Sequence, residues 1–312
     1  MKTLQTISCE EIMATPIAPI PFSVENLFGQ GLYLFAGAPK IGKSWLSLDI
    51  CLSVAKGEAV LGQRTAKGTA LYLCLEDNKV RLQNRLYELT NEPTDSLYFS
   101  LLADTIGDGL EQQIEQFYLA HRDLKIVVID TLQKIRSSEE SAYGTDYTEL
   151  ASLKRLADKL AITILLVHHT RKCKDSDPFN MISGSTGLRG GADGALVLIE
   201  KDRATHEATL YCEGRDIESR ELKLQRTAHR WELTDKINLH TKKQYIPNVV
   251  SRKILQSAQR LLEQDVLFEM KRSNGIRKIQ AQYFGDNRDD SDDKTDASLS
   301  SAVDPVRNVG TA

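Results

Sequence analysis

The chain has 312 residues, 41% of them hydrophobic and 27% charged, which are the values of a globular protein long enough to bury a core. No segment resembles a signal peptide or forms an apolar run of about 18 residues, which argues against export and membrane insertion. The five cysteines are scattered without a C-x-x-C pair, so we expect a reduced, cytoplasmic protein rather than a disulfide framework.

The formal net charge of −3 conceals an uneven distribution along the chain. Residues 236–284 contain ten Lys and Arg against three Asp and Glu, whereas residues 286–312 contain three against seven. A basic block suits contact with nucleic acid, but a solvated helix face explains it equally well.

Composition shifts divide the chain into four parts. Residues 1–21 contain Pro16, Pro19 and Pro21 and are expected to form an arm that packs either on its own domain or on a neighbour. Residues 22–232 hold the strongly patterned elements, and residues 233–284 form a basic extension with one amphipathic helix over 249–270. The acidic tail, 285–312, lacks aromatic residues and is expected to be disordered.

A phosphate-binding loop follows the first predicted strand, 31–36. Residues 37–44 match the pattern G-x-x-x-x-G-K-S, and the residues after them continue at helical spacing. Backbone N–H groups of such a loop surround phosphate oxygens at a helix N-terminus, Lys43 reaches the β- and γ-phosphates, and Ser44 binds Mg²⁺. The predicted ATP-binding set is Gly37, Ala38, Pro39, Lys40, Ile41, Gly42, Lys43, Ser44 and Trp45.

Four further strands alternate with helices along the next part of the chain. Strand 70–75 ends in Glu76 and Asp77, strand 97–102 follows one helix, and strand 125–130 runs from aliphatic residues into Asp130 in the Walker B pattern. Strand 162–167 ends in His168 and His169. Alternating strands and helices predict an α/β fold with a mostly parallel sheet and helices on both faces.

Three shorter β-type runs follow a polar, Gly-rich stretch, at 195–201, 206–212 and 220–226. Their close spacing predicts antiparallel strands added at the C-terminal edge of the sheet.

With these motifs in place, the chain resembles the RecA-like ATPases of the plasmid RepA type, which are relatives of the hexameric replicative helicases. The resemblance covers about residues 22–232. It is carried by the phosphate loop, by Leu73–Asp77, Ile129–Leu132 and Leu166–Lys172, and by Ile182–Gly187 and Gly214–Asp216.

The resemblance and the chemistry together suggest roles for the residues at the strand ends. Glu76 is the candidate that orients or deprotonates the attacking water, with Asp77 a less favoured candidate that more plausibly caps the next helix. Asp130 would hold Mg²⁺ with Ser44. One of the two histidines, His169 rather than His168, would sense the γ-phosphate.

A ring ATPase of this kind also uses an arginine finger from the neighbouring subunit. The resemblance places it at Arg215, with Arg189 and Arg203 as alternatives. Glu213 stands where the family often has a basic residue, which is a departure from its pattern.

Single-stranded DNA, if bound, should contact the two segments that follow Asp130 and His169. The first offers Arg136, Ser137, Ser138 and Tyr143, and the second offers Arg171, Lys172, Lys174 and Phe179. Either segment is equally well explained as a solvated surface loop.

The sequence therefore predicts an ATP- and Mg²⁺-dependent motor, a hexameric helicase or translocase of a plasmid or other mobile element. Two alternatives remain, namely an ATP-dependent switch, loader or regulator that does not unwind DNA, and a degraded copy with little activity.

Overall fold

The computed structural model describes residues 4–136, 143–173, 175–184, 186–202 and 204–234, all within one unit that spans residues 1–237. The predicted helix 249–270, the acidic tail and nearly all of the basic extension lie outside the described residues.

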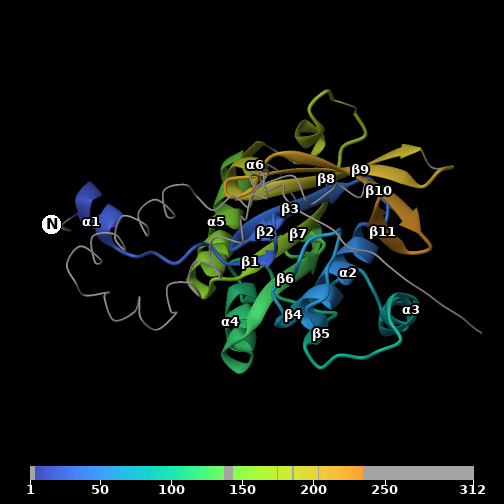
Figure 1. Cartoon of the computed structure of the whole chain (residues 1–312), viewed down its shortest axis with the longest axis horizontal. Helices are drawn as coiled ribbons and strands as arrows, with labels where there is room; N and C mark the ends of the chain where they lie inside the picture. Colours follow the sequence, from blue (N-terminus) through green and yellow to red (C-terminus); the bar gives the residue numbers. More distant parts are fainter. Residues whose placement is uncertain (1–3, 137–142, 174, 185, 203, 235–312) are drawn as a thin grey trace, which may run out of the picture. The chain divides into compact units, whose positions relative to one another are not determined.

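A nine-stranded sheet organises the described part of the chain, in the order β11-β10-β9-β8-β3-β7-β6-β4-β5 (Figure 1). The strands from β8 to β5 pair in parallel, and β9, β10 and β11 pair antiparallel beyond β8. The prediction of a mostly parallel sheet with antiparallel strands at one edge is thus confirmed. The strands are β3 (Gly31–Gly37), β4 (Thr69–Cys74), β5 (Leu97–Ser100), β6 (Leu124–Asp130), β7 (Thr163–His169), β8 (Gly194–Asp202), β9 (Glu207–Gly214), β10 (Arg220–Thr227) and β11 (Arg230–Leu233).

Helices cover both faces of this sheet, as predicted. On one face, α2 (Lys43–Lys56) and α3 (Lys79–Leu89) contribute to a first apolar cluster that includes Leu46, Leu48 and Leu82. On the other face, α4 (Leu110–Ala120), α5 (Tyr143–Leu160) and α6 (Thr186–Gly191) contribute to a second cluster. The central strands are buried on both faces, which explains their continuous apolar runs.

Several elements differ from the sequence prediction. The structure adds a short helix, α1 (Cys9–Ala14), without buried residues, and a small hairpin of β1 (Phe22–Val24) and β2 (Phe28–Gly29). Strand β5 ends at Ser100 rather than at residue 102, because the Ser100 hydroxyl donates to the Leu102 carbonyl at 2.6 Å and turns the chain. Two 3-10 turns, η1 (Leu132–Lys134) and η2 (Pro178–Met181), follow the ends of β6 and β7.

None of the described helices combines the length and apolar character needed to cross a bilayer.

Candidate nucleotide site

The loop between β3 and α2 has the backbone shape that a phosphate cradle needs. Lys40 and Gly42 both adopt left-handed conformations, with φ of 65° and 106°. A Cβ on Gly42 would lie 2.9 Å from Nε1 of Trp231, so glycine is required here by both conformation and space. The first N–H groups of α2 lack intrahelical acceptors and face outward from the helix N-terminus, where they favour an anion.

Lys43 lies folded across this loop. It is only 6% exposed, and its Nζ donates to the carbonyls of Gly37 at 2.8 Å and Ala38 at 3.0 Å. Burial lowers the pKa of Lys43 to about 8, against the opposing influence of Asp130 and Glu76. The Lys43 amine contacts two neutral carbonyls in this loop, so it is suited to pair with a phosphate group instead.

Asp130 ends β6 beside the phosphate loop. Its carboxylate accepts hydrogen bonds from the hydroxyl of Ser44 and, at 2.8 Å, from the hydroxyl of Tyr72. Burial raises the pKa of Asp130, although both hydrogen bonds and Lys43 oppose that rise. The Walker B carboxylate and the loop hydroxyl predicted to share Mg²⁺ therefore lie together.

The donor set around Asp130 fits magnesium rather than a metal caged by protein. Among residues 4–234, where described, there is no group of three or more His, Cys, Asp or Glu side chains arranged to hold a metal ion. Mg²⁺ is usually held by one or two carboxylates together with substrate phosphates and water. Ser44 and Asp130 would be the ligands that the protein contributes to Mg²⁺.

Glu76 and Asp77 follow β4 but have different surroundings. Glu76 is exposed, and its Oε1 accepts a hydrogen bond from the Thr131 hydroxyl at 3.3 Å. Asp77 instead pairs with Arg85 and, at 2.9 Å, with Arg81, both on α3. Asp77 does not cap that helix as predicted, because the cap is Asn78, whose side chain accepts from the Arg81 N–H at 2.9 Å. Glu76 is the acid that remains available to a water molecule.

The two histidines at the end of β7 point to different neighbours. Nε2 of His168 lies 3.0 Å from the Ser183 carbonyl, in a buried position. His169 pairs in register with Gly37, and burial followed by the charge of Lys43 lowers its pKa, against Glu76 and Asp130. Its Nδ1 is buried and has no hydrogen-bond partner among the described residues. A ring nitrogen without a protein partner can accept or donate a hydrogen bond to a polar ligand.

Arg215 lies at the other end of the sheet from the phosphate loop. Gly214 pairs with Gly194, which pairs with Tyr33, four residues before Gly37 in β3. Gly214 lies two strands away from β3 and level with Tyr33, four residues along the strand from Gly37. Two strand spacings and the rise of four residues separate Gly214 from Gly37 by roughly 16 Å, which is further than an arginine side chain spans. The Arg215 side chain is 61% exposed and rests 3.3 Å from Asp193, so it cannot serve the loop of its own subunit.

The alternative arginine, Arg189, is already engaged. Its guanidinium donates to Glu213 at 2.6 and 2.8 Å and to Asp177 at 3.2 Å. Glu213, the departure from the family pattern, is thus the partner of Arg189. Arg203 lies outside the described residues.

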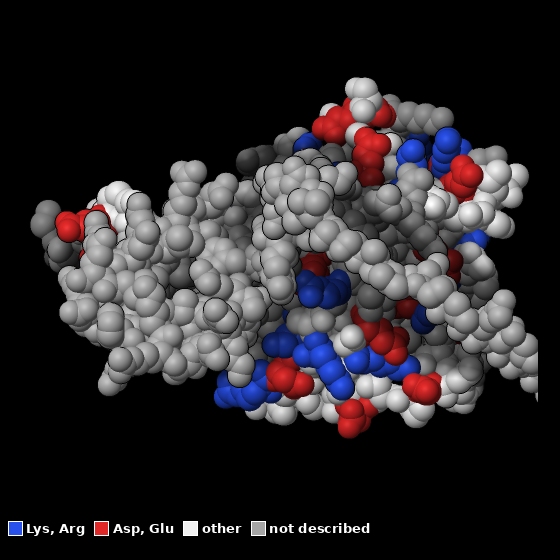
Figure 2. Space-filling model, in the orientation of Figure 1, with Lys and Arg blue, Asp and Glu red and all other residues white. Residues whose placement is uncertain are grey.

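The predicted DNA-contacting segments are described only in part. Arg136 follows η1 with its side chain only 5% exposed, and its Nε lies 3.1 Å from the Glu149 carboxylate. Arg171 and Lys172 are exposed, and Phe179 lies under the Arg189 guanidinium at 5.0 Å. Ser137, Ser138, Lys174 and the Tyr143 side chain lie outside the described residues. On the face drawn in Figure 2, the described Lys and Arg side chains are interspersed with Asp and Glu.

Sequence reasoning missed Tyr72, the partner of Asp130. Tyr72 is fully buried in β4 among aliphatic neighbours. A buried tyrosine hydroxyl usually needs a hydrogen-bond partner, and that rule was the available signal.

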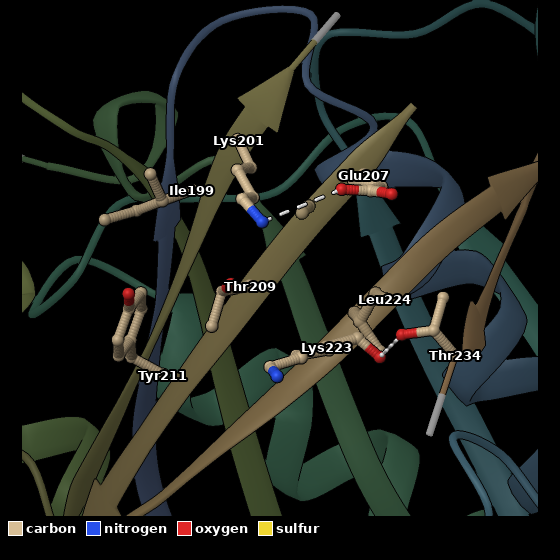
Figure 3. Close-up of a pocket in the computed structure, with 9 residues that line it drawn as sticks. Ile199, Lys201, Glu207, Thr209, Tyr211, Lys223, Leu224 and Thr234 are labelled. Carbon is tan, nitrogen blue, oxygen red and sulfur yellow. Dashed lines mark hydrogen bonds and ion pairs between the residues drawn. The ribbon is translucent and has the colours of Figure 1, made fainter. Parts of the chain in front are cut away.

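A cavity of about 460 Å³ lies away from this chemistry, on β8, β9 and β10 (Figure 3). Ile199 and Tyr211 on its wall pack with the second apolar cluster, on the opposite sheet face from α2. Its polar contacts are an ion pair of Lys201 with Glu207 at 4.0 Å and a hydrogen bond from Thr234 to the Lys223 carbonyl at 3.0 Å. The cavity contains none of the phosphate-loop or strand-end residues described above, so the candidate nucleotide site is the phosphate loop and not this cavity.

Comparison with known proteins identifies the fold and the family of this chain. A solved structure described as an ATPase domain is similar to this chain, with a TM-score of 0.53 over 66% of this chain and 85% of that one. At 13% sequence identity, that likeness shows the fold alone. The model of a family described as "AAA domain" matches residues 3–175, which is more than half of the sequence and includes the phosphate loop, Glu76, Asp130 and His169. The chain therefore belongs to this AAA domain family and has a RecA-like P-loop fold.

Proposed function

We propose that this protein binds and hydrolyses ATP and uses the energy to act on DNA. The observation that supports hydrolysis is the convergence of Lys43, Ser44, Asp130, Glu76 and His169 at the carboxyl ends of four neighbouring strands, β3, β7, β6 and β4. That edge is where open α/β sheets bind their ligands.

Each residue has a definite task in this proposal. Lys43 exchanges its loop carbonyls for phosphate oxygens, and Ser44 and Asp130 hold Mg²⁺, which neutralises charge on the phosphates when bound. Glu76 orients and deprotonates the attacking water, because its carboxylate is exposed and within hydrogen-bond reach of Thr131. His169, whose pKa is lowered by burial and by the charge of Lys43, would contact the γ-phosphate through a ring N–H.

Completion of the site requires a second copy of the chain. Arg215 is exposed at the far end of the sheet, too far from the phosphate loop of its own chain, so it would have to serve the loop of an adjacent subunit. Asp193 fastens its backbone, because the Arg215 N–H donates to the Asp193 carbonyl at 2.8 Å. We therefore propose a hexameric ring in which Arg215 acts in trans.

Action on single-stranded DNA as a RepA-type helicase or translocase is the finer proposal, supported by the motif resemblance and the exposed Arg171 and Lys172. The test is the ATPase rate with and without single-stranded DNA, measured alongside the mass of the assembly and strand separation on a forked substrate. A motor shows DNA-stimulated turnover and strand separation. Stimulation without strand separation identifies a switch or loader, and negligible turnover under both conditions identifies a degraded copy.

A further inference from the structure

Two aromatic side chains from distant parts of the sequence are stacked at the edge of the phosphate loop. Trp45 follows Ser44 in the first turn of α2, and His229 lies in the turn between β10 and β11. Their ring centroids are 4.1 Å apart with an interplanar angle of 12°. The guanidinium of Arg85 lies 5.5 Å from the Trp45 ring.

The strands beside His229 are held to the domain by an ion pair, a hydrogen bond and packing, whereas the His229 ring is partly exposed. On β11, Arg230 pairs with Asp49 at 3.2 Å and donates to the Leu89 carbonyl at 2.8 Å, and Trp231 packs against Gly42. The His229 side chain is 45% exposed, and its Nε2 is 4.0 Å from Glu88. The turn residue before it, Ala228, has a left-handed φ of 54°.

The sheet order shows which end of a bound nucleotide would meet this stack. Glu76 follows β4, Asp130 ends β6 and His169 ends β7, all on one side of β3, and they define the γ-phosphate end. The strands β8 to β11 lie on the other side of β3. A nucleotide whose γ-phosphate faces His169 therefore directs its base toward the β10–β11 turn.

We propose that Trp45 and His229 bind the purine base of the nucleotide whose phosphates occupy the loop, an inference that rests on the proposed function. The base enters between the two rings. Rings 4.1 Å apart leave no room for a third, so one must move. Trp45 is fixed in α2, whereas His229 is carried on a two-residue turn, so His229 is the side chain that swings outward. The stack would then set a preference for nucleotides over bare polyphosphates.

The alternative is that the stack only fastens the hairpin to α2. The two explanations differ in which ligand is affected. A base site contributes to the binding of ATP but not of inorganic tripolyphosphate, which has the phosphates without the base. A fastening that shapes the loop affects both ligands alike.

The experiment measures the Kd of ATP and of tripolyphosphate for the full chain, the variants His229→Ala and His229→Phe, and a matched control, His121→Ala. His121 is likewise stacked, 4.4 Å from Phe117, but on the far face of the sheet. Loss of one stacking surface weakens binding about tenfold. We expect that loss for ATP alone in His229→Ala, restoration in His229→Phe, and no change in His121→Ala.

A second readout uses the fact that the chain has two tryptophans, Trp45 and Trp231. In the Trp231→Phe variant, emission from Trp45 should change on addition of ATP and stay constant on addition of tripolyphosphate. If His229→Ala loses affinity equally for ATP and tripolyphosphate, or loses affinity for neither, the proposed base site is wrong, but the phosphate site is unaffected by that result. Failure of the wild-type chain to bind either ligand overturns the proposed function itself.

Discussion

The hydroxyl of Tyr72 donates a 2.8 Å hydrogen bond to Oδ2 of Asp130, which joins the middle of β4 to the end of β6. Both side chains are buried, and burial raises the pKa of each. Tyr72 thus stays a protonated donor, and its hydrogen bond helps Asp130 to stay ionised for Mg²⁺.

Replacement of this donor should weaken the metal site. In Tyr72→Phe, the pKa of Asp130 rises further because a hydrogen bond to its charged form is lost, at a cost of roughly 1.5–3 kcal/mol. We expect the acid limb of ATPase activity to move to higher pH and the Mg²⁺ requirement to increase. Titration of activity against Mg²⁺ at several pH values measures both, and an unchanged Mg²⁺ requirement would contradict the role of Tyr72.

Removal of the loop cation should abolish tight ATP binding. Lys43→Ala deletes the amine that now contacts the Gly37 and Ala38 carbonyls and that would pair with phosphate. Calorimetric titration measures the affinity, with Lys159→Ala as a control because Lys159 pairs with Glu115 at an exposed position. Unchanged ATP affinity in Lys43→Ala would refute the site.

The lowered pKa of Lys43 predicts that ATP binding takes up a proton in alkaline solution. The free protein loses the Lys43 proton through a pKa of about 8, and phosphate favours the charged form. Uptake should therefore be small at pH 7 and approach about one proton at pH 9, with affinity falling as pH rises above 8. Calorimetry in buffers of different ionisation enthalpy measures the uptake. Lys43→Arg, whose side chain stays charged, should abolish it.

Loss of the acid that orients water should separate binding from turnover. Glu76→Gln retains shape and ATP affinity but should lower the hydrolysis rate about 10²–10⁴-fold. The matched control is Glu115→Gln on α4, far from the loop. If Glu76→Gln turns over near the wild-type rate, another acid holds the role, despite the engagement of Asp77 by Arg81 and Arg85.

A trans role for Arg215 predicts an activity that depends on assembly. Arg215→Ala should keep ATP binding and fold, because Asp193 retains Lys154 at 2.7 Å and the Leu32 N–H at 3.0 Å, yet lose about 10³–10⁵ in turnover. Arg64→Ala, which removes an exposed arginine paired with Glu25, should lose nothing.

Mixing the two inactive variants tests the interface directly. Rings that contain Arg215→Ala and Glu76→Gln subunits should regain activity, because some interfaces pair an intact Glu76 with an intact Arg215. Mixed rings that stay inactive would place the finger elsewhere, and a fully active monomer would remove the ring from the mechanism.

The local elements of the site could be predicted from the sequence. The phosphate loop, the strand that ends in Asp130 and the strand that ends in His169 each depend on neighbours within a few positions, so periodicity and motif spacing reveal them. Parallel pairing follows as well, because alternating strands and helices leave few other arrangements.

Contacts between distant segments were decided only by the tertiary structure. The stack of Trp45 on His229, the hydrogen bond of Tyr72 with Asp130, and the ion pair of Arg189 with Glu213 join residues whose separation carries no periodic signal. The sequence by itself determined which groups can bind a nucleotide, whereas strand order and register decided which of them meet, because one step of register or one place in the sheet moves a side chain by several ångströms.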